Sequence, residues 1–130
     1  MPRLFTLDEA NELLPRLQEL LIEMQDNKRT LDRLQQQIGV LTGRASGNGH
    51  LVAKELSDKR RDAEALTKRL NELAEEISSM GCELKGIDEG LIDFASEREG
   101  RVVNLCWRLG EETIGWWHEL DTGFAGRQPL

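Results

Sequence analysis

Hydrophobic residues recur every three or four positions through most of residues 7–80, which is the period of an amphipathic helix. Leu dominates these positions, and Glu, Gln, Arg and Lys fill most of the places between them. A glycine-rich segment, residues 43–50, interrupts the pattern and predicts a loop. We therefore expect two helices of about 30 residues that form a long antiparallel helical hairpin, similar to a coiled coil and about 45 Å long.

The first helix has a predicted start and a predicted irregularity. Thr6 and Glu9 have the spacing of a capping box, so the helix should begin directly after Thr6. Pro15 has no backbone N–H and crowds the preceding turn, which predicts a kink near residues 11–14. We expect one kinked, continuous helix, with a break into two helices as the alternative.

After Gly81 the hydrophobic period changes from helical spacing to strict alternation, which is typical of strands. Three antiparallel strands are predicted, and a short fourth one at residues 83–85 is an alternative. The three strands are residues 91–97, 101–109 and 114–118, followed by an irregular docked C-terminal tail. The expected fold class is α+β in a single domain, residues 1–130, with a helical stalk (1–80, loop 43–50) and a small β head with its tail (81–130).

Composition separates the head from the stalk. All three Trp, both Cys and five of the six aromatic residues follow residue 80. Trp116 and Trp117 should point to opposite faces of their strand, so one of them belongs in the core. Trp117 and Trp107 are candidates for an exposed aromatic platform, and burial of all three Trp side chains is the alternative.

Charge and cysteine usage narrow the function classes. The net charge is −7, and residues 81–130 hold five basic against ten acidic side chains. An acidic head repels phosphates, so no nucleic-acid partner is expected, and a cation or a basic partner suits it better. No apolar run approaches the roughly 18 residues that span a membrane. Two Cys without a CxxC pair indicate a reduced, cytoplasmic protein.

The candidate chemistry lies in the polar residues of the head. His118, Glu119 and Asp121 could donate nitrogen and oxygen ligands to a divalent cation, and Asp88 or Asp93 could add another. A borderline ion such as zinc would favour His118 with support from a carboxylate or Cys106. Cys106 and His118 could instead form a thiolate–imidazole pair. The alternatives are a packing histidine and a small buried cysteine. The candidate ion-pair or anion-binding residues are Arg108 with Glu111, and Arg127 with Asp121.

Several segments resemble a known family. They are FTLDEANELLP at residues 5–15, GCELKGIDEGLIDF at 81–94, LCWRLGE at 105–111 and WHELDTGFAGRQP at 117–129. Together they are similar to the domain of unknown function 2203, a family of small uncharacterised bacterial proteins, over nearly the whole chain. The resemblance implies a bacterial cytosolic protein and assigns no activity, substrate or catalytic residue.

Two functions from different classes follow. The leading expectation is a non-catalytic, dimeric interaction or scaffold protein, because Leu13, Leu20, Leu34 and Leu41 widen the apolar stripe beyond what one partner helix covers. A second copy, or another helical protein, would cover the excess. The alternative is a divalent-metal-binding or thiol-dependent enzyme with its site in the β head, and no reaction is predicted.

Overall fold

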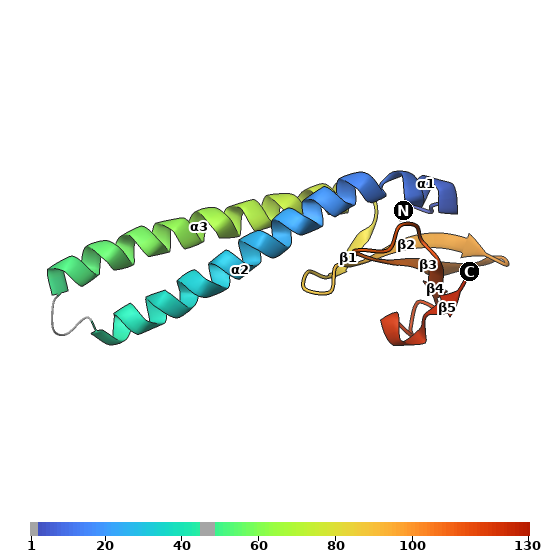
Figure 1. The fold of residues 1–130 in the computed structure, drawn as a ribbon. Helices are drawn as coiled ribbons and strands as arrows, with labels where there is room; N and C mark the ends of the chain where they lie inside the picture. The colour runs from blue at the N-terminus through green and yellow to red at the C-terminus, as the bar shows by residue number, and fades with distance from the viewer. Residues whose placement is uncertain (1–2, 45–48) are drawn as a thin grey trace. The chain divides into compact units, whose positions relative to one another are not determined.

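A computed structural model of the chain describes residues 3–44 and 49–130. The fold is α+β, as predicted: long helices precede an antiparallel sheet (Figure 1). The helices are α1 (Leu7–Glu12), α2 (Leu14–Arg44) and α3 (Gly49–Ser79), and a 3-10 turn, η1, spans Phe124–Gly126. The strands are β1 (Glu83–Gly86), β2 (Leu91–Arg98), β3 (Arg101–Arg108), β4 (Trp116–His118) and β5 (Gln128–Pro129). In the described residues no helix is both long and apolar enough to cross a membrane.

The sheet has five strands in the order β1-β2-β3-β4-β5, so the prediction of three strands is wrong. The alternative strand near residues 83–85 is present as β1. The tail, expected to be irregular, contributes β5, which pairs with β4 through Trp117 and Gln128. Two residues are too few to show an alternating pattern, and Pro129 is tolerated because β5 is an edge strand.

The helix irregularity lies at Leu13, which separates α1 from α2, so the prediction of one continuous helix is wrong. Thr6 caps α1 in the predicted capping box with Glu9. Leu13 keeps right-handed helical backbone angles, and its N–H donates to the carbonyl of Ala10 at 3.1 Å. Pro15 has no N–H to offer the carbonyl four residues earlier, so the regular hydrogen-bond ladder is interrupted there.

The loop between the long helices is shorter than predicted. Gly43 and Arg44 still belong to α2, while Gly49 and His50 begin α3. The rest of the predicted loop, residues 45–48, lies outside the described residues. A glycine inside a helix costs only about 1 kcal/mol, so Gly39 and Gly43 do not end α2. Gly81, just after α3, has φ +92°, as expected for a residue that ends a helix.

The described chain divides into two compact units within α2 and α3. Unit 1 combines the described residues up to Ile22 with Ala74–Leu130, and unit 2 is Glu23–Leu73. The sequence pattern instead suggested a division after residue 80. The last part of α3 joins unit 1 because Ile77 is fully buried there, as is Leu17 of α2.

Unit 1 buries one face of the sheet, which we call the inner face. Ile92 and Phe94 of β2 pair with Trp107 and Leu105 of β3, so all four side chains point to this face, and all are buried. Phe5 packs edge-on against Phe94, with 5.3 Å between ring centroids. The Phe5 N–H also donates to the carbonyl of Ala95 at 2.7 Å. Residues before the first helix are thus fixed to β2.

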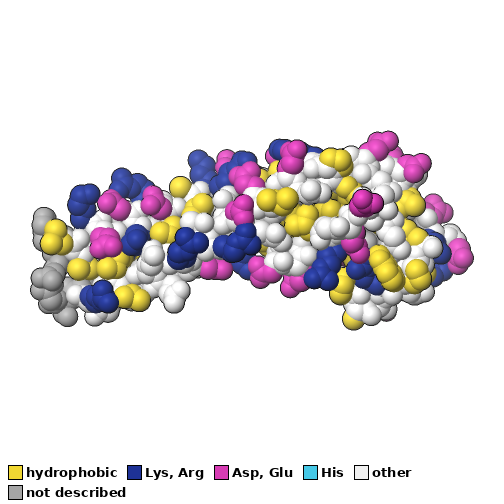
Figure 2. All heavy atoms as spheres, viewed as in Figure 1, with side chains coloured by type: hydrophobic (Ala, Val, Ile, Leu, Met, Phe, Trp, Pro, Cys, Tyr) yellow, Lys and Arg dark blue, Asp and Glu magenta, His cyan; other side chains and the backbone are white. Residues whose placement is uncertain are grey.

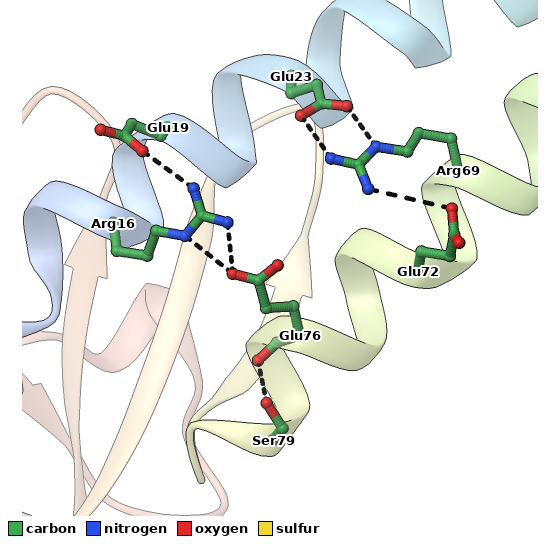
Figure 3. A network of polar contacts seen from close by, with 7 residues as sticks. All are labelled: Arg16, Glu19, Glu23, Arg69, Glu72, Glu76 and Ser79. Carbon is green, nitrogen blue, oxygen red and sulfur yellow. Dashed lines mark hydrogen bonds and ion pairs between the residues drawn. The ribbon is translucent and has the colours of Figure 1, made fainter.

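Ion pairs within each unit fix the antiparallel register of the long helices (Figure 3). In unit 1, Arg16 of α2 reaches Glu76 of α3 at 2.7 Å. In unit 2, Arg69 of α3 donates from two nitrogens to Glu23 of α2, at 2.6 and 3.0 Å. All four side chains are more than a third exposed, so each pair stabilises the fold by about 1 kcal/mol at most and mainly specifies the register.

Candidate functional site

The opposite face of the sheet, the outer face, brings three predicted candidates together. Asp93 of β2 lies directly opposite Cys106 of β3, and His118 of β4 lies opposite Asn104, two residues along the same strand from Cys106. Side chains two residues apart point to one face, so all four share it. One ligand atom each of Asp93, Cys106 and His118 lie within 4.8 Å of one another.

This cluster is buried, although it lies on the face away from the aromatic core. The exposed fractions are 4% for Asp93, 1% for Cys106 and 2% for His118. Buried groups able to carry charge are found in folded proteins when they are paired with one another or bind a metal. The burial of these three side chains is therefore not explained by hydrophobic packing alone.

His118 is held by hydrogen bonds at both ring nitrogens. Its Nδ1 lies 2.7 Å from the carbonyl oxygen of Glu119, and its Nε2 lies 3.1 Å from Asp93 Oδ1. A carbonyl oxygen only accepts, so Nδ1 carries a proton and donates it. Nε2 is thereby directed into the cluster. Metal-binding histidines are commonly oriented in this way, with the remaining N–H fixed by a carbonyl or carboxylate.

Cys106 is a protonated thiol at neutral pH in the metal-free protein. Burial raises its pKa to about 12, and the Asp93 carboxylate adds to the effect. A thiol with so high a pKa is a poor nucleophile, and His118 Nε2 is engaged with Asp93, so the arrangement disfavours the thiolate–imidazole hypothesis. A bound metal ion would instead displace the thiol proton and use the thiolate as a ligand.

A cavity of about 160 Å³ opens beside the cluster. Its other lining residues are Lys85 of β1, Leu91 of β2, Asn104 of β3, and Leu120, Gly123 and Phe124 of the tail. The Lys85 ammonium lies 2.9 Å from Glu83 Oε1. Its pKa is raised, first by the hydrogen bond with Glu83 and to a smaller extent by the charge of Asp93. Lys85 therefore lies close enough to the cluster to sense its charge.

The tail is fixed over the outer face by Arg127. Its Nη2 donates to both carboxylate oxygens of Glu111, at 2.9 and 2.8 Å. The guanidinium also lies 4.8 Å from the ring centroid of Phe124 and 4.9 Å from that of Trp116. The Arg127 side chain is only 11% exposed, so this ion pair is partly desolvated and is stronger than the surface pairs of the helices.

Two predicted ligands lie outside the cluster. The Glu119 side chain points away and binds Arg101, whose hydrogen bond lowers the Glu119 pKa. Asp121 is exposed in the tail. The predicted pairing of Arg127 with Asp121 is also replaced, since Arg127 binds Glu111. Glu111 does meet Arg108, but at the backbone N–H, 2.7 Å away, and not at its guanidinium.

The predicted aromatic platform is also placed differently. Trp107 and Trp117 are buried, with exposed fractions of 1% and 7%, because both lie on the inner face. Trp116, on the outer face, is 37% exposed and lies beside Arg127. Lys85 and Asn104 were not predicted as site residues. Asn104 lies two residues before Cys106 in β3, so the strand pattern already places both side chains on the same face.

The cluster offers one nitrogen, one sulfur and one oxygen donor. This mixture suits borderline ions such as zinc and does not suit magnesium or calcium, which prefer oxygen ligands alone. Three protein ligands would leave one coordination position of a bound ion open, and the cavity lies beside the three side chains. Sites of this kind bind a water molecule or a substrate in the fourth position, whereas structural zinc sites have four protein ligands.

Comparison with known proteins identifies the family of this chain but assigns no activity to it. Neither the curated proteins nor the solved structures provide a match to this chain. A family profile matches residues 3–130, nearly the entire sequence, and its description is that of an uncharacterized conserved protein. The chain belongs to this family, DUF2203.

Proposed function

We propose that this protein binds a divalent metal ion of the zinc type through Asp93, Cys106 and His118. The observation that carries the proposal is the convergence of three different donor atoms, each from a separate strand and each buried, within 4.8 Å. A buried Asp–His pair could by itself serve to order the sheet. The thiol at the same point adds a third donor that such a pair does not need.

The open coordination position supports a use in catalysis or ligand binding. A zinc ion with three protein ligands can activate a bound water molecule or polarise a bound carbonyl. The reduced, unpaired state of both Cys82 and Cys106 is compatible with the proposed cytoplasmic location. We place the protein in the metal-dependent class without naming a reaction, since the donor atoms favour a class of ion and indicate no particular chemistry.

Metal content of purified variants tests this proposal. After growth with zinc and desalting, the wild type should retain one zinc per chain, and Cys106→Ser and His118→Ala should lose most of it. Cys106→Ser changes a single atom, so it keeps the fold even if His118→Ala weakens it. Asp121→Ala and Glu64→Ala should retain zinc, because these carboxylates lie outside the cluster. Unchanged zinc in both Cys106→Ser and His118→Ala would remove the site.

A second function, self-association, is favoured by a specific feature of unit 2. The seam between α2 and α3 is only half-buried there at Leu31, Leu34, Ile38, Leu56, Leu66 and Leu70. On the face shown in Figure 2, hydrophobic side chains are exposed among charged ones along these helices. A second copy that packed on this hairpin as a helical bundle would bury them, and another helical protein could do the same.

The feature that supports self-association differs from the one expected from the sequence. Leu20 and Leu41 are buried within a single chain, with exposed fractions of 1% and 8%, so they do not require a partner. Leu13 and Leu34, the other two residues of that expectation, are half-buried, and Leu34 belongs to the seam. Light scattering over a range of micromolar concentrations tests the dimer, and a mass that stays at 14.8 kDa throughout would refute it.

A further inference from the structure

The cavity beside the cluster limits the size of any ligand that enters it. Its volume is about 160 Å³. A water molecule occupies about 30 Å³ of liquid, so the cavity has room for about five waters, or for a molecule with a handful of non-hydrogen atoms. The group that reaches the metal centre proposed above is therefore small.

The lining of the cavity defines the chemistry of that molecule. Apart from the cluster it presents apolar surface from Leu91, Leu120 and Phe124, and polar groups from Asn104 and Lys85. Of the described residues that line it, Lys85 is the only lysine or arginine. The anionic forms of Asp93 and Cys106 offset the two charges of a divalent ion. Lys85 adds a positive charge at the edge of this cavity, so an anionic group is favoured between metal and lysine.

Lys85 lies at an irregularity in β1. Leu84 pairs with Ile92 and Gly86 pairs with Leu91, so Lys85 and Gly86 together oppose one residue of β2. Such β-bulges are frequent beside active sites. Lys85 forms an ion pair with Glu83, whose side chain is 66% exposed, and such an exposed ion pair is weak. The ammonium can therefore exchange Glu83 for a ligand at low cost.

We infer that the ligand is a short-chain carboxylate. Its carboxylate group takes the open coordination position and contacts the Lys85 ammonium, while its short apolar part lies against Leu91, Leu120 and Phe124. The Asn104 amide is placed to bind a further polar group. This inference rests on the proposed metal centre, and it adds the class of ligand that the centre recognises.

Cobalt-substituted protein provides the test, because the visible absorption bands of a bound cobalt ion respond to a change of ligand. Butyrate should shift these bands saturably, and butyramide, which has the same shape without the charge, should not. Lys85→Met should raise the dissociation constant of butyrate about tenfold, since it removes a charged hydrogen-bond donor and keeps the side-chain length. Lys54→Met, at another exposed lysine in an ion pair, should bind butyrate as the wild type does.

The outcomes separate this inference from the metal proposal. If cobalt binds with the thiolate absorption of Cys106 but butyrate leaves its bands unchanged, the metal centre stands and the carboxylate inference is wrong. The inference is also wrong if butyramide binds as tightly as butyrate, or if Lys85→Met and the wild type have equal affinities. If cobalt does not bind, both proposals fall.

Discussion

Replacing one leucine in each compact unit should show how strongly the two units depend on burial. Leu17 in unit 1 is fully buried, so Leu17→Ala should lower the free energy of unfolding by about 2–5 kcal/mol, the range for a buried leucine. Leu70 in unit 2 is half-buried within one chain, so Leu70→Ala in a monomer should cost about 1–2 kcal/mol. In a dimer that covers the seam, the cost of Leu70→Ala should rise into the range of Leu17→Ala.

Urea denaturation followed by circular dichroism, at two protein concentrations, measures both effects. A dimer makes the midpoint concentration-dependent, because association stabilises only the folded chain. Ser57→Ala, at an exposed position of α3, is the control and should lie within about 0.5 kcal/mol of the wild type. A Leu17→Ala midpoint equal to that of Ser57→Ala would refute the unit 1 core. In a protein shown to be monomeric, equal costs for Leu70→Ala and Leu17→Ala would refute the half-buried seam.

Two further predictions concern the thiols and the first helix. Burial raises the pKa of Cys82 to about 11 and that of Cys106 to about 12, so neither should react with a thiol reagent until the protein unfolds; rapid labelling of the native metal-free protein would contradict this. Thr6→Ala should cost about 1 kcal/mol in urea melts at neutral pH. The backbone N–H of Thr6 and, after it, the Thr6 side chain lower the pKa of Glu9, so the cap is fully formed above the usual glutamate pKa. Thr6→Ala keeps the backbone N–H and removes the side-chain contribution. The cost of Thr6→Ala should therefore shrink as acid protonates Glu9, and a cost that grows in acid would contradict the capping box.

Local signals in the sequence were sufficient for the features that depend on nearby residues. Thr6 and Glu9 form the predicted cap because both partners lie within one helical turn. The alternation along β3 predicted which of its residues share a face. The sequence was sufficient to identify Asp93, Cys106 and His118 as candidate ligands. It was not sufficient to predict that their side chains lie close together, because this depends on the register of the strands.

Part of that register was accessible from one turn. Glu99 and Gly100 both have positive φ, 52° and 80°, and Arg98 pairs with Arg101. This is a two-residue hairpin turn, which fixes the pairing of Asp93 with Cys106. The connection from β3 to β4 has no such signature, so the place of His118 could not be derived. The pairing of Arg127 with Glu111 is likewise a tertiary contact, invisible to local patterns.

The discontinuity of unit 1 has a consequence for folding during synthesis. Its helical start leaves the ribosome first, but Phe5 docks on Ala95 and Phe94, which are made about ninety residues later. Unit 2, Glu23–Leu73, is contiguous, and its described residues belong to two helices that neighbour each other in sequence, so it can form early. During synthesis the segment around Phe5 therefore has no docking partner until β2 has been made, even if the hairpin of unit 2 has already formed. Mutations that weaken β2 should lengthen this exposure and lower yield before they alter the stability of the finished protein.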